Sequence, residues 1–177
     1  ATLAEAGWLR VPSGLPRATL DALPVDAALA DGDAGSRSLL TEVWCSGLVA
    51  PLRNGLQALG LLSSDAVAVQ CTLFRKTPGC NWKVPYHQDL SIPVAGRVAH
   101  AALSGWSMKQ DGWYVQPPVE LLDGLLAARL HLDPCGDDDG ALRVVPETHR
   151  LGRISPERIA AMDKRRDEIV CSAEPGD

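Results

Sequence analysis

One short motif constrains this chain more than any other feature: His87-Gln88-Asp89. Residues two apart on an extended strand point the same way, so His87 and Asp89 would offer one imidazole nitrogen and one carboxylate oxygen to a single metal ion. These are two of the three donors of the 2-His-1-carboxylate set that holds non-haem Fe(II) and leaves positions open for substrates. The ordinary alternative is a histidine and an aspartate that hydrogen-bond at a strand end.

The composition is that of a globular domain. The chain has 177 residues, enough for one domain with its own core. Its net charge of −5, without a basic block, argues against a nucleic-acid surface. No stretch has the length of a transmembrane helix, and the first residues lack the basic and apolar regions of a signal peptide. These features predict a cytoplasmic protein that binds neither nucleic acid nor membrane.

The cysteines favour the same compartment. They are scattered, odd in number and without a CxxC pair, which argues against a disulfide framework or a structural zinc site. They are Cys45, Cys71, Cys80, Cys135 and Cys171. A reducing cytosol is therefore the better interpretation.

Helices are expected mainly in the first third of the chain. Residues 1–35 are rich in Gly, Pro and Asp and predict loops with one short helix over 17–23. Residues 36–60 carry leucines at helical spacing and predict a supporting helix, with Pro51 near its start if Ser46 is the cap.

Strands are expected over 65–177. The alternation over 66–75 predicts a strand on which Gln70, Thr72 and Phe74 share a face. Residues 96–118 are interpreted as a long loop, of the kind that often forms a lid. Two further segments, 125–133 and 141–146, flank a turn-rich linker and predict an antiparallel hairpin.

The chain is expected to end in one more helix and a turn. Ser155-Pro156-Glu157 combines a cap, a proline at the first helical position and an early acid, and predicts a helix to about residue 165. Taken without any resemblance, the pattern indicates an α+β fold, either a sandwich or a barrel.

Two longer runs resemble a known family. The first is FRKTPGCNWKVPYHQD over 74–89; the second is RLHLDP over 129–134 followed by GALRVVPETHRLGR over 140–153. Both resemble the phytanoyl-CoA dioxygenase-like family of Fe(II)/2-oxoglutarate oxygenases, in which the second run usually has glycine where this chain has Glu147. A third block, 171–177, is similar to the Gly-Asp turn before the family's final core strand. The resemblance covers roughly residues 36–177.

The resemblance implies a fold and an activity. The fold is a double-stranded β-helix, a cupin-like jelly-roll of two antiparallel sheets with iron at one mouth. His87 and Asp89 match the family's first two iron ligands. A carboxylate at position 89 favours hydroxylation over the halogenation of related enzymes that carry a small residue there. The reaction would consume dioxygen and 2-oxoglutarate and release succinate and CO2.

Two further residues match cosubstrate positions of the family. Gln70 stands about seventeen residues before the first histidine, where related hydroxylases contact 2-oxoglutarate. Trp106 is the nearest match to a tryptophan that lines the cosubstrate pocket. The alternatives are a cross-strand hydrogen bond for Gln70 and simple lid packing for Trp106.

A third iron ligand has no good candidate in the sequence. His100 lies in an apolar stretch, His131 in a predicted strand, and His149 in a run that is a structural turn in the family. By family order, the distal histidine and an arginine for 2-oxoglutarate would follow Asp177. We therefore expect 1–177 to be a single oxygenase domain that is incomplete at its C-terminus and lacks its last core strands.

Two other functions remain open at this point. One is a non-catalytic binding module of the same fold, for which loss of the third ligand would be the signature. The other is a cupin-like metal enzyme that does not use 2-oxoglutarate.

Overall fold

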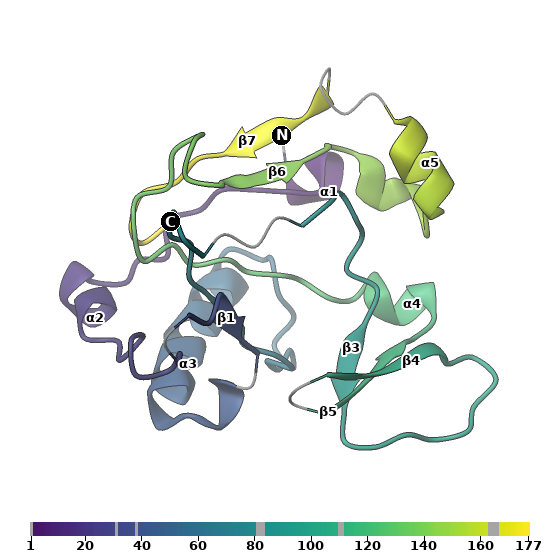
Figure 1. Cartoon of the computed structure of the whole chain (residues 1–177), viewed down its shortest axis with the longest axis horizontal. Helices are drawn as coiled ribbons and strands as arrows, with labels where there is room; N and C mark the ends of the chain where they lie inside the picture. The colour runs from purple at the N-terminus through teal and green to yellow at the C-terminus, as the bar shows by residue number, and fades with distance from the viewer. Residues whose placement is uncertain (1, 31, 38, 81–83, 110–111, 163–166) are drawn as a thin grey trace. The chain divides into compact units, whose positions relative to one another are not determined.

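The computed structural model of the chain describes residues 2–30, 32–37, 39–80, 84–109, 112–162 and 167–177 (Figure 1). Its contacts divide the chain into two units, each assembled from segments that are distant in sequence. The first unit comprises Ala1–Leu23, Asn81–Gln88 and Ala128–Asp177, and the second comprises Pro24–Cys80 and Asp89–Ala127. The division therefore falls inside the His87-Gln88-Asp89 motif.

The first unit begins with two short helices. Helix α1 (Leu3–Ala6) is started by a capping box in which the side chains of Thr2 and Glu5 satisfy each other's backbone N–H groups. It ends at Gly7, whose left-handed backbone (φ 78°) suits glycine. Helix α2 (Arg17–Asp21) follows and buries Leu20.

The rest of the first unit is a two-stranded antiparallel sheet with two more helical segments. Strand β6 (Leu142–Val144) pairs with β7 (Ile169–Cys171), and Figure 1 shows them side by side. Between them lie the 3₁₀ turn η2 (Thr148–Leu151) and helix α5 (Pro156–Ala161). Among the described residues of this region, Ala141, Ile154 and Ala173 are buried.

Helix α3 (Val43–Ala58) dominates the second unit and follows the 3₁₀ turn η1 (Leu39–Thr41). Cys45 in its first turn is completely buried, and Leu39 is 4% exposed. Strands β1 (Gly35–Ser36) and β2 (Leu73–Phe74) form a short antiparallel pair in the same unit.

The second unit also contains a three-stranded antiparallel sheet, in the order β3-β5-β4 (Figure 1). Its strands are β3 (Ile92–Val94), β4 (Ser104–Lys109) and β5 (Gly112–Gln116), and helix α4 (Val119–Leu122) follows. Tyr114 and Val115 in the central strand are each 1% exposed, so this sheet supplies the largest buried side chains of the unit.

The α+β class is confirmed, whereas several of the predicted strands are wrong. Within the described residues, strands pair into three separate small antiparallel sheets. Of the strand predicted over 66–75, only Leu73–Phe74 is a strand, and Val67 and Val69 are 72% and 49% exposed. An alternating pattern becomes a strand only where a partner strand accepts its hydrogen bonds, and residues 66–70 pair with no described strand.

The predicted hairpin pairs β6 with the wrong segment of the chain. No strand forms over 125–133, and β6 pairs instead with β7, which is 25 or more positions further along the chain. The turn chemistry of residues 134–140 was identified correctly, with Gly140 at φ 73°, but a turn does not fix which strand returns beside β6.

Residues 96–118 are not the long loop that was predicted. They contain the β4–β5 pairing, in which Met108 lies opposite Trp113. The segment that carries His87 and Asp89 is not a strand either, because β3 starts only at Ile92.

The helix predictions fared better. The helix over 36–60 is found as η1 and α3, although it starts at Val43 after Glu42 and not after Ser46. Pro51 consequently lies inside the helix, where it cannot donate the usual hydrogen bond. The predicted start of α5 at Ser155 is confirmed by its side chain, which accepts from the Arg158 N–H. Its predicted end near residue 165 lies outside the described residues.

Candidate metal centre

His87 sits on a segment that its neighbours anchor firmly within the first unit. The Gln88 side chain donates to the Gly152 carbonyl (2.8 Å) and accepts from the Ile154 N–H (2.7 Å). The Tyr86 hydroxyl donates to Glu168, which also pairs with Arg143 of β6. Tyr86 and Gln88 are half-buried while His87 between them is exposed. The segment therefore alternates like a strand, with His87 directed away from its anchors.

The His87 ring has a defined tautomer. Its Nδ1 lies 2.8 Å from the Pro85 carbonyl oxygen. A carbonyl can only accept, so Nδ1 must carry the proton, and in the neutral ring Nε2 is then the unprotonated nitrogen. A metal-binding histidine commonly has this arrangement, in which a backbone carbonyl fixes one nitrogen and the other coordinates.

Desolvation and the Glu168 carboxylate raise the pKa of Tyr86 above its ordinary value. The phenol therefore stays protonated at neutral pH and continues to donate to Glu168. This bond ties the residue before His87 to the sheet of β6 and β7.

Asp89 is exposed and lies three residues before β3. It belongs to the second unit, directly after the division from the first. Its carboxylate and the Nε2 of His87 are the donors that the motif offers, one oxygen and one nitrogen, and this set suits Fe(II).

Gln70 is exposed in the second unit, and its side-chain amide donates to the Thr72 hydroxyl (2.8 Å). The partner is two residues away on the same segment. The expectation that Gln70 and Thr72 share a face is consistent with this contact, although residues 66–70 are not a strand.

Trp106 is half-buried on β4 and packs edge-on against Trp113 of β5. Their ring centroids are 6.2 Å apart at an interplanar angle of 82°. The Arg97 guanidinium lies over both rings, 5.9 Å from the centroid of Trp106 and 5.7 Å from that of Trp113. Arg97 could not be identified from the sequence pattern, because its contact with the two rings depends on the pairing of β4 with β5.

The remaining histidines have other partners. The Nδ1 of His100 accepts from the Ala102 N–H (3.2 Å), and the His149 Nε2 donates to the Ala4 carbonyl (3.1 Å). His131 exchanges backbone hydrogen bonds with Gly176 and Asp177. Burial lowers its pKa, and the neighbouring Arg129 adds to this effect.

No three histidine, cysteine, aspartate or glutamate side chains come together as a metal site in the part of the chain that the structure describes. His87 and Asp89 therefore stay predicted iron ligands, on the chemistry of their donor atoms alone.

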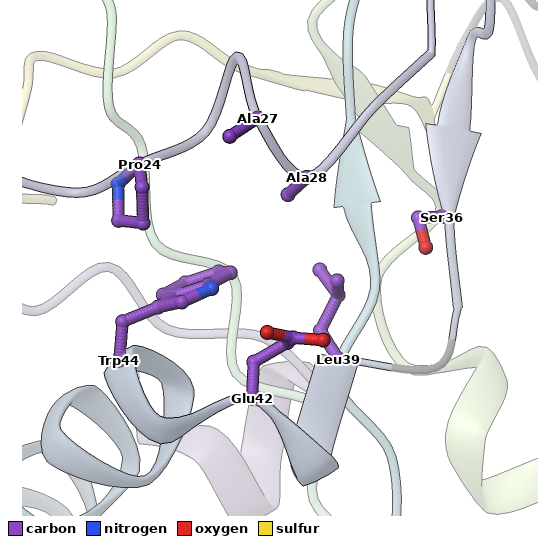
Figure 2. Close-up of a pocket in the computed structure, with 7 residues that line it drawn as sticks. All are labelled: Pro24, Ala27, Ala28, Ser36, Leu39, Glu42 and Trp44. Atoms are coloured by element: carbon purple, nitrogen blue, oxygen red, sulfur yellow. The ribbon is translucent and has the colours of Figure 1, made fainter.

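A pocket of about 310 Å³ lies elsewhere in the second unit. Figure 2 shows Glu42 and Trp44, at the start of α3, across from Ala27 and Ala28. Its other lining residues are Pro24, Ser36 and Leu39. None of the predicted site residues lines it, so this pocket is separate from the candidate metal donors.

The comparison with known proteins agrees with the class of protein that the donor residues suggest. A His-x-Asp donor pair in an α+β chain fits a non-haem iron oxygenase. The model of the phytanoyl-CoA dioxygenase (PhyH) family matches residues 4–177, and the chain belongs to this family. Membership implies a cupin-like jelly-roll fold and, at the level of the family, a dioxygenase of the Fe(II)/2-oxoglutarate type. Comparisons with curated proteins and with solved structures gave no match.

In the described residues, no helix is both long and apolar enough to cross a membrane.

Proposed function

We propose that the protein is a non-haem Fe(II)/2-oxoglutarate-dependent dioxygenase that hydroxylates a small molecule. The observation that carries the proposal is the family match over residues 4–177, which includes the His87-Gln88-Asp89 motif. Bound Fe(II) supplies the dioxygen chemistry, in which 2-oxoglutarate is decarboxylated to succinate and CO2 while the substrate is oxidised.

His87 and Asp89 are proposed as two of the iron ligands. The Pro85 carbonyl holds the proton on Nδ1 of His87 and leaves Nε2 as the coordinating atom. The hydrogen bonds of Tyr86 and Gln88 hold the backbone on either side of His87, so the ring needs little reorganisation to bind the ion.

Gln70 and Trp106 are proposed to contact 2-oxoglutarate. Trp106 offers a half-buried apolar wall, and the Gln70 amide is a donor within the same unit. The third iron ligand is proposed to be none of His100, His131 and His149. The hydrogen bonds that the rings of His100 and His149 already make support this assignment.

The remaining elements of the proposal concern fold and location. We propose that 65–177 forms part of a double-stranded β-helix within one domain, as family membership suggests. A cytoplasmic location is proposed on the scattered cysteines and the absence of a CxxC pair in the sequence.

The test is succinate formation by the intact protein with Fe(II), 2-oxoglutarate and a reductant. Asp89→Ala and His87→Ala should each lower the rate by about 100-fold or more, because each removes a charge or donor from the iron. His100→Ala is the matched control and should retain the wild-type rate. Undiminished succinate formation by Asp89→Ala would refute the assignment.

The same assay distinguishes the other two functions. A binding module of the same fold would bind Fe(II) or ligand without forming succinate. A cupin-like enzyme that needs no 2-oxoglutarate would oxidise its substrate when that cosubstrate is left out.

A further inference from the structure

Arg97 is held in place by aromatic rings. It follows β3 in the chain, and its guanidinium lies within 6 Å of the ring centroids of both Trp106 and Trp113. Two edge-on indoles at 82° present two differently oriented faces to one cation. This arrangement restricts a side chain that is otherwise exposed and flexible.

The charge of Arg97 has no acidic partner among the described residues. Arg10, Arg17, Arg75 and Arg143, by contrast, each pair with a carboxylate. Arg97 interacts instead with ring faces, and such an interaction does not use the in-plane N–H donors of a guanidinium. These donors match the two oxygens of a carboxylate.

The surface around Arg97 is apolar and accessible. Met108 lies opposite Trp113 in the sheet and is 60% exposed, and Val94 lies opposite Trp113 on the other side. Directly opposite residues share a sheet face, so Met108, Trp113 and Val94 form one apolar surface beside the charge. A carboxylate bound by Arg97 could lay its carbon chain on this surface.

We propose that Arg97, positioned by Trp106 and Trp113, is a binding residue for the carboxylate group of a small-molecule ligand. The inference rests on the proposed function for its biological meaning, since the ligand would be the substrate or the cosubstrate of the oxygenase. Binding itself needs neither iron nor turnover, so it is tested independently of the activity.

The experiment is a titration of the intact protein with glutarate, followed by the indole N–H signals of Trp106 and Trp113 in ¹H–¹⁵N NMR spectra. Both signals should shift saturably at millimolar glutarate, and sodium chloride at equal ionic strength should not reproduce the shift. Arg97→Gln should weaken the affinity for glutarate by about 10-fold or more. Arg97→Lys should weaken it less, because lysine keeps the positive charge but lacks the two parallel N–H donors of the guanidinium.

Arg158→Gln, an equal loss of charge on exposed helix α5, is the control and should bind glutarate like the wild type. Equal binding by Arg97→Gln, or an equal shift with sodium chloride, would overturn the inference. Should Arg97→Gln fail to fold, unchanged affinity in Arg97→Lys would overturn it as well.

Competition identifies the source of the carboxylate. If 2-oxoglutarate displaces glutarate at concentrations well below that of glutarate, Arg97 binds the cosubstrate. If 2-oxoglutarate displaces glutarate only at equal or higher concentrations, Arg97 binds the substrate. Either result supports a carboxylate site at Arg97.

Discussion

Glu147 adopts a backbone conformation that favours glycine, and replacing it should stabilise the protein. Its φ of 65° and ψ of −5° place it in the left-handed region, just before η2. Its N–H donates to the Ala6 carbonyl (3.0 Å) and its carbonyl accepts from the Arg150 N–H (3.2 Å), so neighbouring bonds hold this conformation. The family resemblance of the sequence implies glycine at this position.

The magnitude follows from two opposing effects. A left-handed residue with a Cβ costs about 1–2 kcal/mol, and glycine avoids this strain. Glycine also gives the unfolded chain more conformational freedom, which offsets roughly 0.5–1 kcal/mol of this stabilisation. Glu147→Gly should therefore raise the free energy of unfolding by about 0.5–1 kcal/mol, or the melting temperature by about 1–4 °C for a chain of this size.

Urea denaturation followed by tryptophan fluorescence measures this change, with the gain seen as a higher midpoint at an unchanged slope. Glu147→Ala is the matched control, because it removes the same charge but keeps the Cβ and should show no comparable gain. Gly152→Ala should act in the opposite direction, because its φ of 60° and ψ of −149° are accessible essentially to glycine alone. Equal stability of Glu147→Gly and Glu147→Ala would refute the reasoning.

Three further changes test the local structure. Pro51→Ala should raise the free energy of unfolding in urea by about 1 kcal/mol or more, because it restores a hydrogen-bond donor inside α3. Gly35→Ala should lower it by about 1–3 kcal/mol, because the new Cβ would lie 2.5 Å from the Leu73 carbonyl oxygen. Burial lowers the pKa of His131, so the unfolded chain binds its proton more readily. Neutral His131 contributes its full stabilisation above the ordinary histidine pKa of 6.5. This stabilisation is lost as the pH falls from 6.5 through the lowered pKa of the folded state. His131→Gln should reduce the fall in the urea midpoint between pH 7.5 and 5, and an unchanged fall would contradict this account.

Sequence reasoning succeeded where the signal is local. The capping of α5 by Ser155 is such a case, because it needs only neighbouring residues. The box of Thr2 and Glu5 that starts α1 is equally local and was overlooked, although the pattern T-x-x-E is visible in the sequence.

Strands were harder because their stability depends on distant partners. Residues 66–70 alternate well but remain unpaired in the described structure, while Ile169–Cys171 pairs with β6 although no strand was predicted there. The pairing depends on which segments meet in three dimensions, and the chain's own periodicity does not determine it.

In the candidate site, too, local features could be predicted from the sequence and contacts between distant segments could not. The motif at 87–89 identified two donor side chains, and the strand-like alternation of Tyr86, His87 and Gln88 is observed even though the segment is not a strand. The Pro85 carbonyl that sets the His87 tautomer is also local. By contrast, the contact of Arg97 with Trp106 and Trp113 depends on the pairing of β4 with β5, which sequence pattern did not predict.

The most direct test of the central claim is the affinity of the intact protein for Fe(II), measured without oxygen by quenching of tryptophan fluorescence. The wild type should bind Fe(II) more tightly when 2-oxoglutarate is present, because both would share one site. His87→Ala and Asp89→Ala should each weaken Fe(II) binding by about 10-fold or more, whereas His100→Ala should not. Wild-type affinity in both His87→Ala and Asp89→Ala would contradict the claim that this motif holds the iron.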